Sequence, residues 1–217
     1  MTGDDEVLDR TTSPRGELVL RRSGDAFEVI SNGVFLMDTR DGRSERALVR
    51  EAVARHAAAH RLLIGGLGVG FSLLEAVDVP TLTEIDVVEI EPVVVGWHAT
   101  HLRTITGAAL ADPRVVVVVD DVRHHLEAGT GGYDVICLDV DNGPDWTVTE
   151  SNTSLYGTEG LATCVRALAP GGVLAVWSAS RSPAYERLLD EQVGGFETVE
   201  LPVPRGQPDV VYLARRR

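Results

Sequence analysis

After residue 60, short runs of valine, leucine and isoleucine alternate with segments whose apolar residues recur at helical spacing. The runs "RLLI", "DVVEI", "RVVVVV", "YDVICL" and "VLAVW" are apolar at nearly every position rather than at every second one. Such runs are typical of strands buried on both faces of a parallel sheet, with helices as the crossovers. The sequence therefore predicts a doubly wound α/β sandwich. The last two strands, 196–203 and 209–216, lie too close together for a helical crossover, so we expect them to pair antiparallel.

The segment before this region has a different pattern. Three short segments between residues 17 and 38 read as strands, and the turns "SGD" and "SNG" separate them as hairpins require. We expect a small antiparallel β unit over 17–45 and one α/β domain over 46–217. The acidic and polar start, residues 1–16, is predicted to be a flexible tail.

The chain carries a formal net charge of −13, which argues against a nucleic-acid partner because such binding needs a basic surface. No apolar run is long enough to cross a bilayer, and the acidic start is unlike a signal peptide. Cys137 and Cys164 have no CxxC partner, so neither a disulfide framework nor a zinc site is expected. These features predict a cytoplasmic protein with no membrane partner and no metal. The histidines, among them His98 and His101, are expected at the surface.

Residues suited to ligand binding follow the predicted strands at their carboxyl ends, where open α/β sheets bind ligands. Gly66, Gly68 and Gly70 follow the first strand, and glycine lets a backbone turn tightly and approach a ligand closely. Because position 71 is phenylalanine, the spacing departs from the G-x-G-x-x-G fingerprint of dinucleotide sites. We expect these glycines to bind a cofactor, and the alternative is that they serve only strand-to-helix packing.

Carboxylates end the next three strands. Glu89, nineteen residues after the last of these glycines, can accept hydrogen bonds from both ribose hydroxyls. Asp121 can accept one from an adenine amino group, although aspartate also suits a helix N-cap. Asp139 ends the fourth strand, and the neighbours Ile90 and Val122 are assigned to the same cofactor pocket. Glycines, Glu89, Asp121 and Asp139 thus end four successive strands. This order predicts a nucleoside site in which Asp139 lies beside the reacting end of the ligand.

The stretch 140–154 has almost no apolar periodicity and contains Asn-Gly-Pro, so it reads as an active-site loop. Asp139 and Asp141 are the predicted catalytic acids, with Asp139 as the candidate base. Asn142, Asp145 and Trp146 are the predicted substrate-binding residues, and the Trp146 ring could cover the pocket or contact a cation. The alternatives are solvated loop acids and a tryptophan that anchors the loop to the core.

The order of these motifs resembles class I S-adenosylmethionine-dependent methyltransferases and, more closely, the spermidine synthase (polyamine aminopropyltransferase) family of that fold. The segments "LLIGGLGVG", "VVEIEP", "DPRVVVVVDDVRHHL", "YDVICLD" and "LAPGGVLAVW" fall where that family has its equivalents. The resemblance implies a mostly parallel seven-stranded sheet with an antiparallel last strand, after a small β-hairpin unit. It implies that 46–217 is a Rossmann-like, S-adenosylmethionine-binding catalytic domain. Glu89 would hold the ribose and Asp121 the adenine amino group, while Asp139 would face the incoming nucleophile.

Several positions depart from that family. It has an aspartate in the glycine loop that binds the amine of decarboxylated S-adenosylmethionine, and Gly68 stands there. Its second aspartate, three residues after the fourth-strand acid, is replaced by Asn142. Its hairpin glutamine and its Tyr-His-Glu segment align with Leu36 and with "ERA" at 45–47. These departures favour a donor other than the one that a polyamine synthase uses.

We therefore expect an S-adenosylmethionine-dependent transferase that transfers a methyl group to a small-molecule acceptor such as an amine. Transfer from a sulfonium is an in-line displacement, and a protonated acceptor needs a base, for which Asp139 is the candidate. One alternative is aminopropyl transfer from decarboxylated S-adenosylmethionine, and another is a non-catalytic nucleoside-binding protein. A third is internal cyclisation or elimination on the methionine chain. Related enzymes often form dimers, so a homodimer is also considered.

Overall fold

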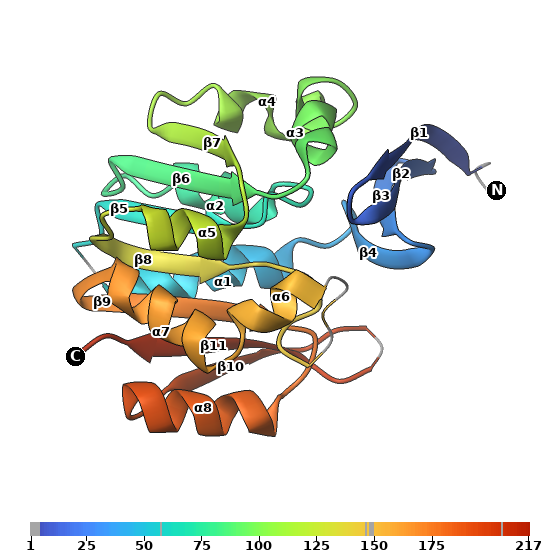
Figure 1. Cartoon of the computed structure of the whole chain (residues 1–217). Helices are drawn as coiled ribbons and strands as arrows, with labels where there is room; N and C mark the ends of the chain where they lie inside the picture. Colours follow the sequence, from blue (N-terminus) through green and yellow to red (C-terminus); the bar gives the residue numbers. More distant parts are fainter. Residues whose placement is uncertain (1–4, 57, 146, 148–149, 205) are drawn as a thin grey trace.

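The computed structural model describes residues 5–56, 58–145, 147, 150–204 and 206–217. Its first part is a four-stranded antiparallel sheet in the order β1-β2-β3-β4, called the N-terminal sheet below. Figure 1 shows this sheet beside the larger domain, at the end toward which strands β6 and β8 point. The strands of the N-terminal sheet are β1 (Glu6–Ser13), β2 (Gly16–Ser23), β3 (Ala26–Ser31) and β4 (Val34–Asp38).

The structure differs from the predicted tail, because residues 6–13 form strand β1. This strand pairs with β2 along its length, and the indole Nε1 of Trp97 donates a hydrogen bond to Asp9 Oδ2 at 2.7 Å. The sequence of β1, EVLDRTTS, has too few apolar residues to reveal a strand by its own pattern. Its order comes from pairing with β2 and from contacts with the larger domain.

The larger domain contains a seven-stranded sheet in the order β10-β11-β9-β8-β5-β6-β7. The five strands from β5 to β9 are parallel, whereas β11 runs antiparallel to both of its neighbours, β9 and β10. The predicted α/β fold with an antiparallel last strand is confirmed. The strands are β5 (Arg61–Gly65), β6 (Glu84–Glu89), β7 (Val115–Val119), β8 (Tyr133–Leu138), β9 (Leu168–Ser178), β10 (Glu197–Leu201) and β11 (Asp209–Arg215).

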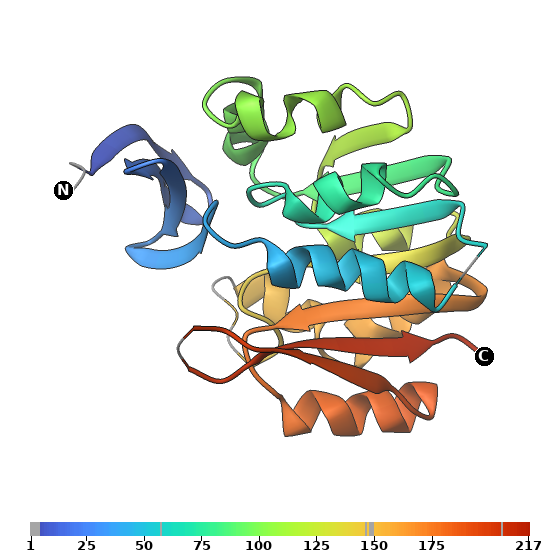
Figure 2. The same cartoon turned by 180° about the vertical axis from the view of Figure 1, so that it is seen from behind.

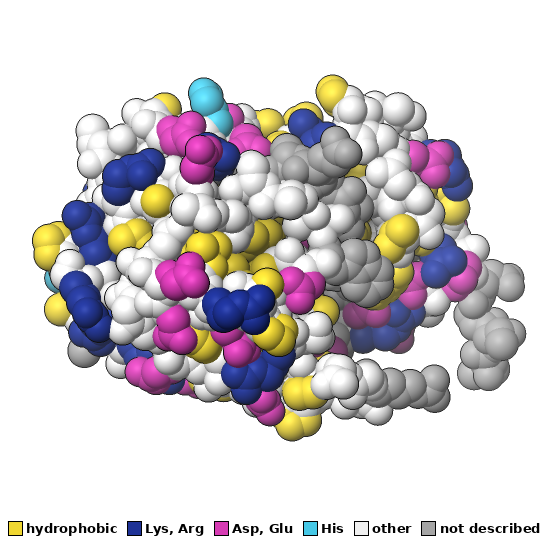
Figure 3. Space-filling view, turned by 60° about the horizontal axis from the view of Figure 1, so that its bottom comes forward, with side chains coloured by type: hydrophobic (Ala, Val, Ile, Leu, Met, Phe, Trp, Pro, Cys, Tyr) yellow, Lys and Arg dark blue, Asp and Glu magenta, His cyan; other side chains and the backbone are white. Residues whose placement is uncertain are grey.

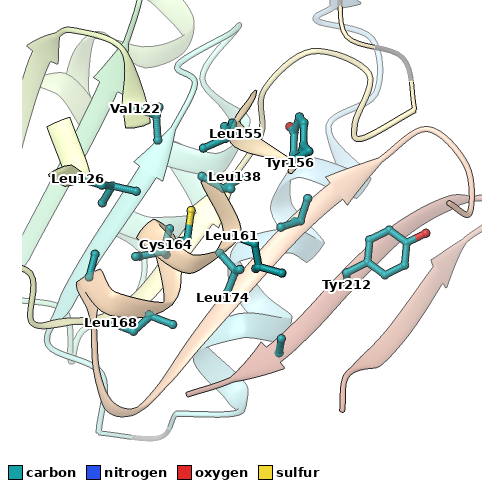
Figure 4. Packing of buried hydrophobic residues seen from close by; sticks show 14 of the residues in the cluster. Val122, Leu126, Leu138, Leu155, Tyr156, Leu161, Cys164, Leu168, Leu174 and Tyr212 are labelled. Atoms are coloured by element: carbon teal, nitrogen blue, oxygen red, sulfur yellow. The ribbon is translucent and has the colours of Figure 1, made fainter. Parts of the chain in front are cut away.

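Helices cover both faces of this sheet, with α1, α2 and α4 on one face and α5, α7 and α8 on the other (Figure 1, Figure 2). Neighbouring residues of β5 alternate between two hydrophobic cores: Leu62 packs on the α1 side and Leu63 on the α5 side. Figure 4 shows the second core, to which Leu126, Leu138 and Leu161 belong. Both faces of the central strands are buried, which explains why these strands are apolar at nearly every position, whereas Val116 and Val119 of the edge strand β7 are exposed. The helices are α1 (Arg43–Ala54), α2 (Phe71–Val77), α3 (Pro92–Ala99), α4 (Arg103–Leu110), α5 (Val122–Ala128), α6 (Glu150–Leu155), α7 (Thr158–Ala167) and α8 (Pro183–Val193).

Helix α6 begins inside the stretch 140–154, which was predicted to be an irregular loop, and ends at Leu155. Its sequence, ESNTSL, has one apolar residue and no helical periodicity. Contacts with the preceding strand end hold this region: Asn152 Nδ2 donates to Asp141 Oδ2 at 2.8 Å, and the Tyr156 hydroxyl donates to the Val140 carbonyl at 2.6 Å. The helix is therefore stabilised by tertiary contacts, which a local pattern does not contain.

A third hydrophobic core joins the N-terminal sheet to the larger domain. Leu18, Leu20 and Val29 of the sheet pack with Val69 and with Trp97 of α3. This packing places the N-terminal sheet over the carboxyl edge of the parallel strands. The sheet is therefore in a position to form one wall of a ligand site.

The described part of the chain contains no helix that is long and apolar enough to cross a bilayer. On the face drawn in Figure 3, basic side chains lie beside acidic ones. Arg181 and Glu186, whose Nε and Oε1 atoms are 2.7 Å apart, form one of the molecule's many such ion pairs. Acidic and basic side chains are therefore interspersed on this face.

Candidate active site

A cavity lies between the N-terminal sheet and the carboxyl ends of β5, β6 and β8. It has roughly 990 Å³ of space that no protein atom fills, a volume that includes open solvent at its mouth. The N-terminal sheet supplies an apolar wall that includes Leu18, Val29, Leu36 and Met37. The opposite wall is strongly acidic: one guanidinium, Arg15, and five carboxyl groups line the cavity, those of Glu89, Glu91, Asp121, Asp139 and Asp141.

The glycine loop after β5 forms the floor of the cavity. Gly66 has φ of +94°, and a Cβ atom there would lie 2.2 Å from the Asp139 carbonyl oxygen. Gly68 has φ of +51°, and its Cβ would lie 2.8 Å from Met37 Sδ. Gly66 therefore requires glycine, for conformation and for space, because the atom that its Cβ would meet belongs to the backbone. At Gly68 the positive φ favours glycine, but the flexible Met37 side chain could move aside for a Cβ. Gly70 lies outside the lining and precedes the first turn of α2 as its N-cap.

His98 of α3 is buried against this loop, and the prediction of a surface position is therefore wrong for this residue. Its side chain is buried in α3, and its Nε2 donates a hydrogen bond to the Gly68 carbonyl at 2.9 Å. The other ring nitrogen, Nδ1, accepts one from the Thr106 hydroxyl at 2.6 Å. Burial lowers the pKa of His98, which favours the neutral ring that this pattern requires. The spacing of apolar residues gave no sign of this contact.

Glu89, the last residue of β6, is buried and is fixed by the backbone around it. Its Oε2 accepts a hydrogen bond from the Leu67 N–H and its Oε1 accepts one from the Glu91 N–H, each at 2.8 Å. Burial raises the pKa of Glu89, and these backbone hydrogen bonds oppose the rise. Each carboxylate oxygen has a further lone pair, so Glu89 fits the predicted contact with two ribose hydroxyls.

Asp121, Ile90 and Val122 also line the cavity. Asp121 caps α5: its Oδ1 accepts hydrogen bonds from the N–H groups of Arg123 and His124 at 2.8 and 3.1 Å. The capping role that was considered for this residue is therefore present. It leaves Oδ2 available for an amino group, so the adenine role remains a prediction.

Asp139 follows β8 and lines the cavity. Its Oδ2 accepts a hydrogen bond at 2.9 Å from the hydroxyl of Ser72, in the first turn of α2. Burial raises the pKa of Asp139 to about 6, and the charges of Glu89 and Asp209 add to the rise, while the Ser72 hydrogen bond opposes it. No described guanidinium offsets these effects. Asp139 is therefore a carboxylate of raised basicity beside a cavity.

Glu45 belongs to the same acidic region, although the sequence pattern did not single it out as a functional residue. It lies in the first turn of α1, and burial together with the charge of Asp139 raises its pKa to about 7. Its Oε2 accepts a hydrogen bond from the Ser44 hydroxyl at 3.0 Å. Only the tertiary structure brings α1, α2 and β8 together at this point.

The residues after Asp139 separate into two groups. Asp141 lines the cavity and has φ of +53°, a conformation that is uncommon outside glycine and that recurs at functional sites. Asn142 and Asp145 are absent from the described lining: the Asn142 carbonyl accepts from the Ala179 N–H at 3.2 Å, and Asp145 Oδ1 accepts from the Ser182 hydroxyl at 2.6 Å. Trp146 lies outside the described residues.

Arg15 is a cavity residue that the sequence pattern missed, because it lies in what was predicted as tail. It occupies the turn between β1 and β2 and reaches across to the larger domain. Its Nε lies 2.6 Å from Glu91 Oε1, and its Nη2 donates to the Ile90 carbonyl at 2.8 Å. Arg15 thereby fastens the N-terminal sheet to the end of β6.

The carboxylates, glycines and apolar side chains of the cavity fit a nucleoside that carries a positive charge. The described residues contain no group of three His, Cys, Asp or Glu suited to a metal ion.

Comparison with solved structures defines the fold class of the protein. The fold matches spermidine synthase from Thermotoga maritima with a TM-score of 0.81, over 97% of this chain and 73% of that one, at 17% identity. A spermidine synthase in complex with the transition-state analogue AdoDATO matches with a TM-score of 0.80, also at 17% identity, over 97% and 72% of the two chains. The chain therefore has the class I methyltransferase-like fold of spermidine synthases.

The family follows from the sequence. Residues 44–193 match the Spermine/spermidine synthase domain, so the chain belongs to that family. A polyamine aminopropyltransferase of Mycobacterium tuberculosis is 33% identical over 180 residues, which cover 81% of this chain and 33% of that protein. One from Streptomyces coelicolor is 32% identical over 203 residues, covering 90% and 34% respectively. The chain thus spans about a third of the length of these relatives.

These findings correct the prediction of methyl transfer, which is wrong. The matched family is that of spermine and spermidine synthases, and the curated relatives are named polyamine aminopropyltransferases. The prediction rested on the departures at Gly68, Asn142 and Leu36. Those positions differ from a family pattern, but they contain no feature that selects a methyl group over a longer one.

Proposed function

We propose that this protein is an aminopropyltransferase that uses decarboxylated S-adenosylmethionine and a small amine of the polyamine class. The amine nitrogen attacks the carbon next to the sulfonium sulfur, and the carbon–sulfur bond breaks. Its electron pair goes to sulfur, which leaves as the neutral thioether methylthioadenosine. The new carbon–nitrogen bond gives a longer polyamine, and the nitrogen loses one proton.

The acidic cavity is what supports a cationic donor and a cationic acceptor. Five carboxyl groups and one guanidinium line it, so its field attracts positive charge. In this proposal Glu89 holds the ribose hydroxyls and Asp121 the adenine amino group. Asp141, which is bonded to Asn152 and turned into the cavity, contacts a cationic nitrogen. A loop aspartate is absent at Gly68, so the remaining cavity acids supply the negative charge for the donor amine.

The observation that carries the proposal is the position of Asp139. Its carboxyl lies in the cavity wall, and burial raises its pKa to about 6. At pH 7 to 8 it is ionised, yet it is more basic than an ordinary aspartate, which suits a general base. Asp139 accepts the proton that the attacking amine loses. The rate should fall as the pH drops through about 6, because the base is then protonated.

The test is turnover by the purified chain with decarboxylated S-adenosylmethionine and putrescine, cadaverine or spermidine, read by mass spectrometry as methylthioadenosine and the extended amine. Asp139→Asn should lower kcat by about 100-fold or more, because general bases contribute that much. Asp190 is an exposed residue of α8, so Asp190→Asn is the matched control and should leave kcat unchanged. Tight nucleoside binding with no turnover for any of the amines would instead indicate a binding protein and end the proposal.

A further inference from the structure

We propose that Ser72 is a positioning residue that holds Asp139 for proton transfer, an inference that rests on the proposed function. Ser72 is 2% exposed and lies in the first turn of α2, directly after the glycine loop. A buried hydroxyl needs a hydrogen-bond partner, and two acceptors lie within reach. They are Asp139 Oδ2 at 2.9 Å and the Glu45 carbonyl oxygen at 3.3 Å.

Ser72 has one hydroxyl hydrogen, so it can serve these two acceptors only in turn. When Asp139 is ionised, Ser72 donates to Oδ2, the nearer acceptor. This hydrogen bond fixes the carboxylate plane and leaves Oδ1 free to receive a proton from the amine. The contact is also one that favours the ionised form of Asp139.

When Asp139 has taken up the proton on Oδ1, its Oδ2 becomes a neutral and weaker acceptor. The Ser72 hydrogen can then turn from Oδ2 to the Glu45 carbonyl. No covalent bond of Ser72 forms or breaks, and its proton count stays the same. The Ser72 hydrogen therefore has an acceptor in both protonation states of the base. A hydroxyl can rotate between two acceptors in this way, whereas a backbone N–H has a fixed direction.

Other groups around Asp139 act on its charge but cannot replace this contact. They come from each element packed against it: α1, β6, β8, β11 and the segment after α6. Burial and the charges of Glu89 and Asp209 make the ionised form of Asp139 less favourable. The titratable groups that interact with Asp139 are Glu45, Glu89, Cys137, Tyr156 and Asp209. Ser72 is the hydrogen-bond donor that opposes them.

The test compares Ser72→Ala with Ser72→Thr, which keeps the hydroxyl, and with Thr163→Val. Thr163 is a buried hydroxyl residue of α7 that accepts a hydrogen bond from Arg166, so its loss controls for a buried hydroxyl removed elsewhere. We expect Ser72→Ala to lower kcat about tenfold with little change in KM. In this variant, the fall of kcat on the acidic side of its pH profile should begin at a higher pH, because the hydrogen bond that lowers the pKa of Asp139 is lost. Ser72→Thr should restore the wild-type profile, and Thr163→Val should not move it.

A second measurement does not depend on the reaction. Carbon-13 NMR of labelled aspartate carboxyls would follow the titration of Asp139 in the free protein, with the signal assigned by its loss in Asp139→Asn. Ser72→Ala should shift that titration to higher pH. An unshifted titration in a folded Ser72→Ala protein would overturn the inference. If the wild type transfers no aminopropyl group while the titration still shifts, the proposed function fails and the coupling of Ser72 to Asp139 stands.

Discussion

At Gly66, the backbone after β5 passes against the backbone after β8. The residue has φ of +94°, and a Cβ there would lie 2.2 Å from the Asp139 carbonyl oxygen. Gly66→Ala should therefore combine conformational strain with a backbone collision, and we expect a loss of about 3 kcal/mol or more in the free energy of unfolding. Urea unfolding would measure this loss. Nucleoside binding should weaken as well, because any relief of the collision moves Asp139.

Gly171 provides the matched control for this prediction. It also has a positive φ, +78°, but nothing lies within 4 Å of the Cβ that alanine would add. Gly171→Ala should therefore show the conformational cost alone, about 1 to 2 kcal/mol. Equal losses at the two positions would mean that strain, and not the close approach of the two strand ends, explains the glycine at 66.

At the scale of elements, the turn between β1 and β2 connects the N-terminal sheet to the cavity. Arg15 bonds to Glu91 and to the Ile90 carbonyl, next to the residue assigned to the ribose. Arg15→Ala should loosen this connection, and we expect calorimetry to show methylthioadenosine binding about tenfold more weakly, a change of about 1.4 kcal/mol. Amide exchange in β1 and β2 should become faster.

Arg10 is the matched residue in the same hairpin. Its guanidinium pairs with Glu17 at 2.7 Å, and both side chains are largely exposed. Such surface pairs contribute little, so Arg10→Ala should leave both binding and amide exchange near wild-type values. If Arg15→Ala behaves like Arg10→Ala, the turn is a surface contact without influence on the site.

For the molecule as a whole, the sequence predicts what depends on local pattern. The parallel sheet could be inferred because its strands are apolar at nearly every position, and the cavity edge because carboxylates and glycines follow those strands. Strand β1 and helix α6 could not, since their few apolar residues show no period and their order comes from Trp97, Tyr156 and Asn152. Ser72 and Glu45 were missed for the same reason. Each contacts or influences Asp139 only after α1, α2 and β8 have packed.

The acids gathered around Asp139 should affect the stability of the whole molecule in a pH-dependent way. Burial and the charge of Asp139 raise the pKa of Glu45 from 4.5 to about 7, so the folded state binds its proton more tightly than the unfolded state does. The ionised form therefore costs stability above about pH 7, and this cost is removed as the pH falls toward 4.5. Glu45→Gln should stabilise the protein by about 2 kcal/mol at pH 8, a value reduced for partial solvent contact.

The gain from Glu45→Gln should shrink at pH 6 and vanish below about pH 4.5, where both versions carry a neutral side chain. Urea unfolding at several pH values would show it, with exposed Glu191→Gln on α8 as the control. Parallel curves for Glu45→Gln and wild type would contradict the prediction. Because an ionised Glu45 lowers the stability of the fold, we expect its negative charge to serve binding instead, which fits a cationic acceptor. Putrescine should accordingly stabilise the wild type more than Glu45→Gln at pH 8, because only the wild type has this charge to neutralise.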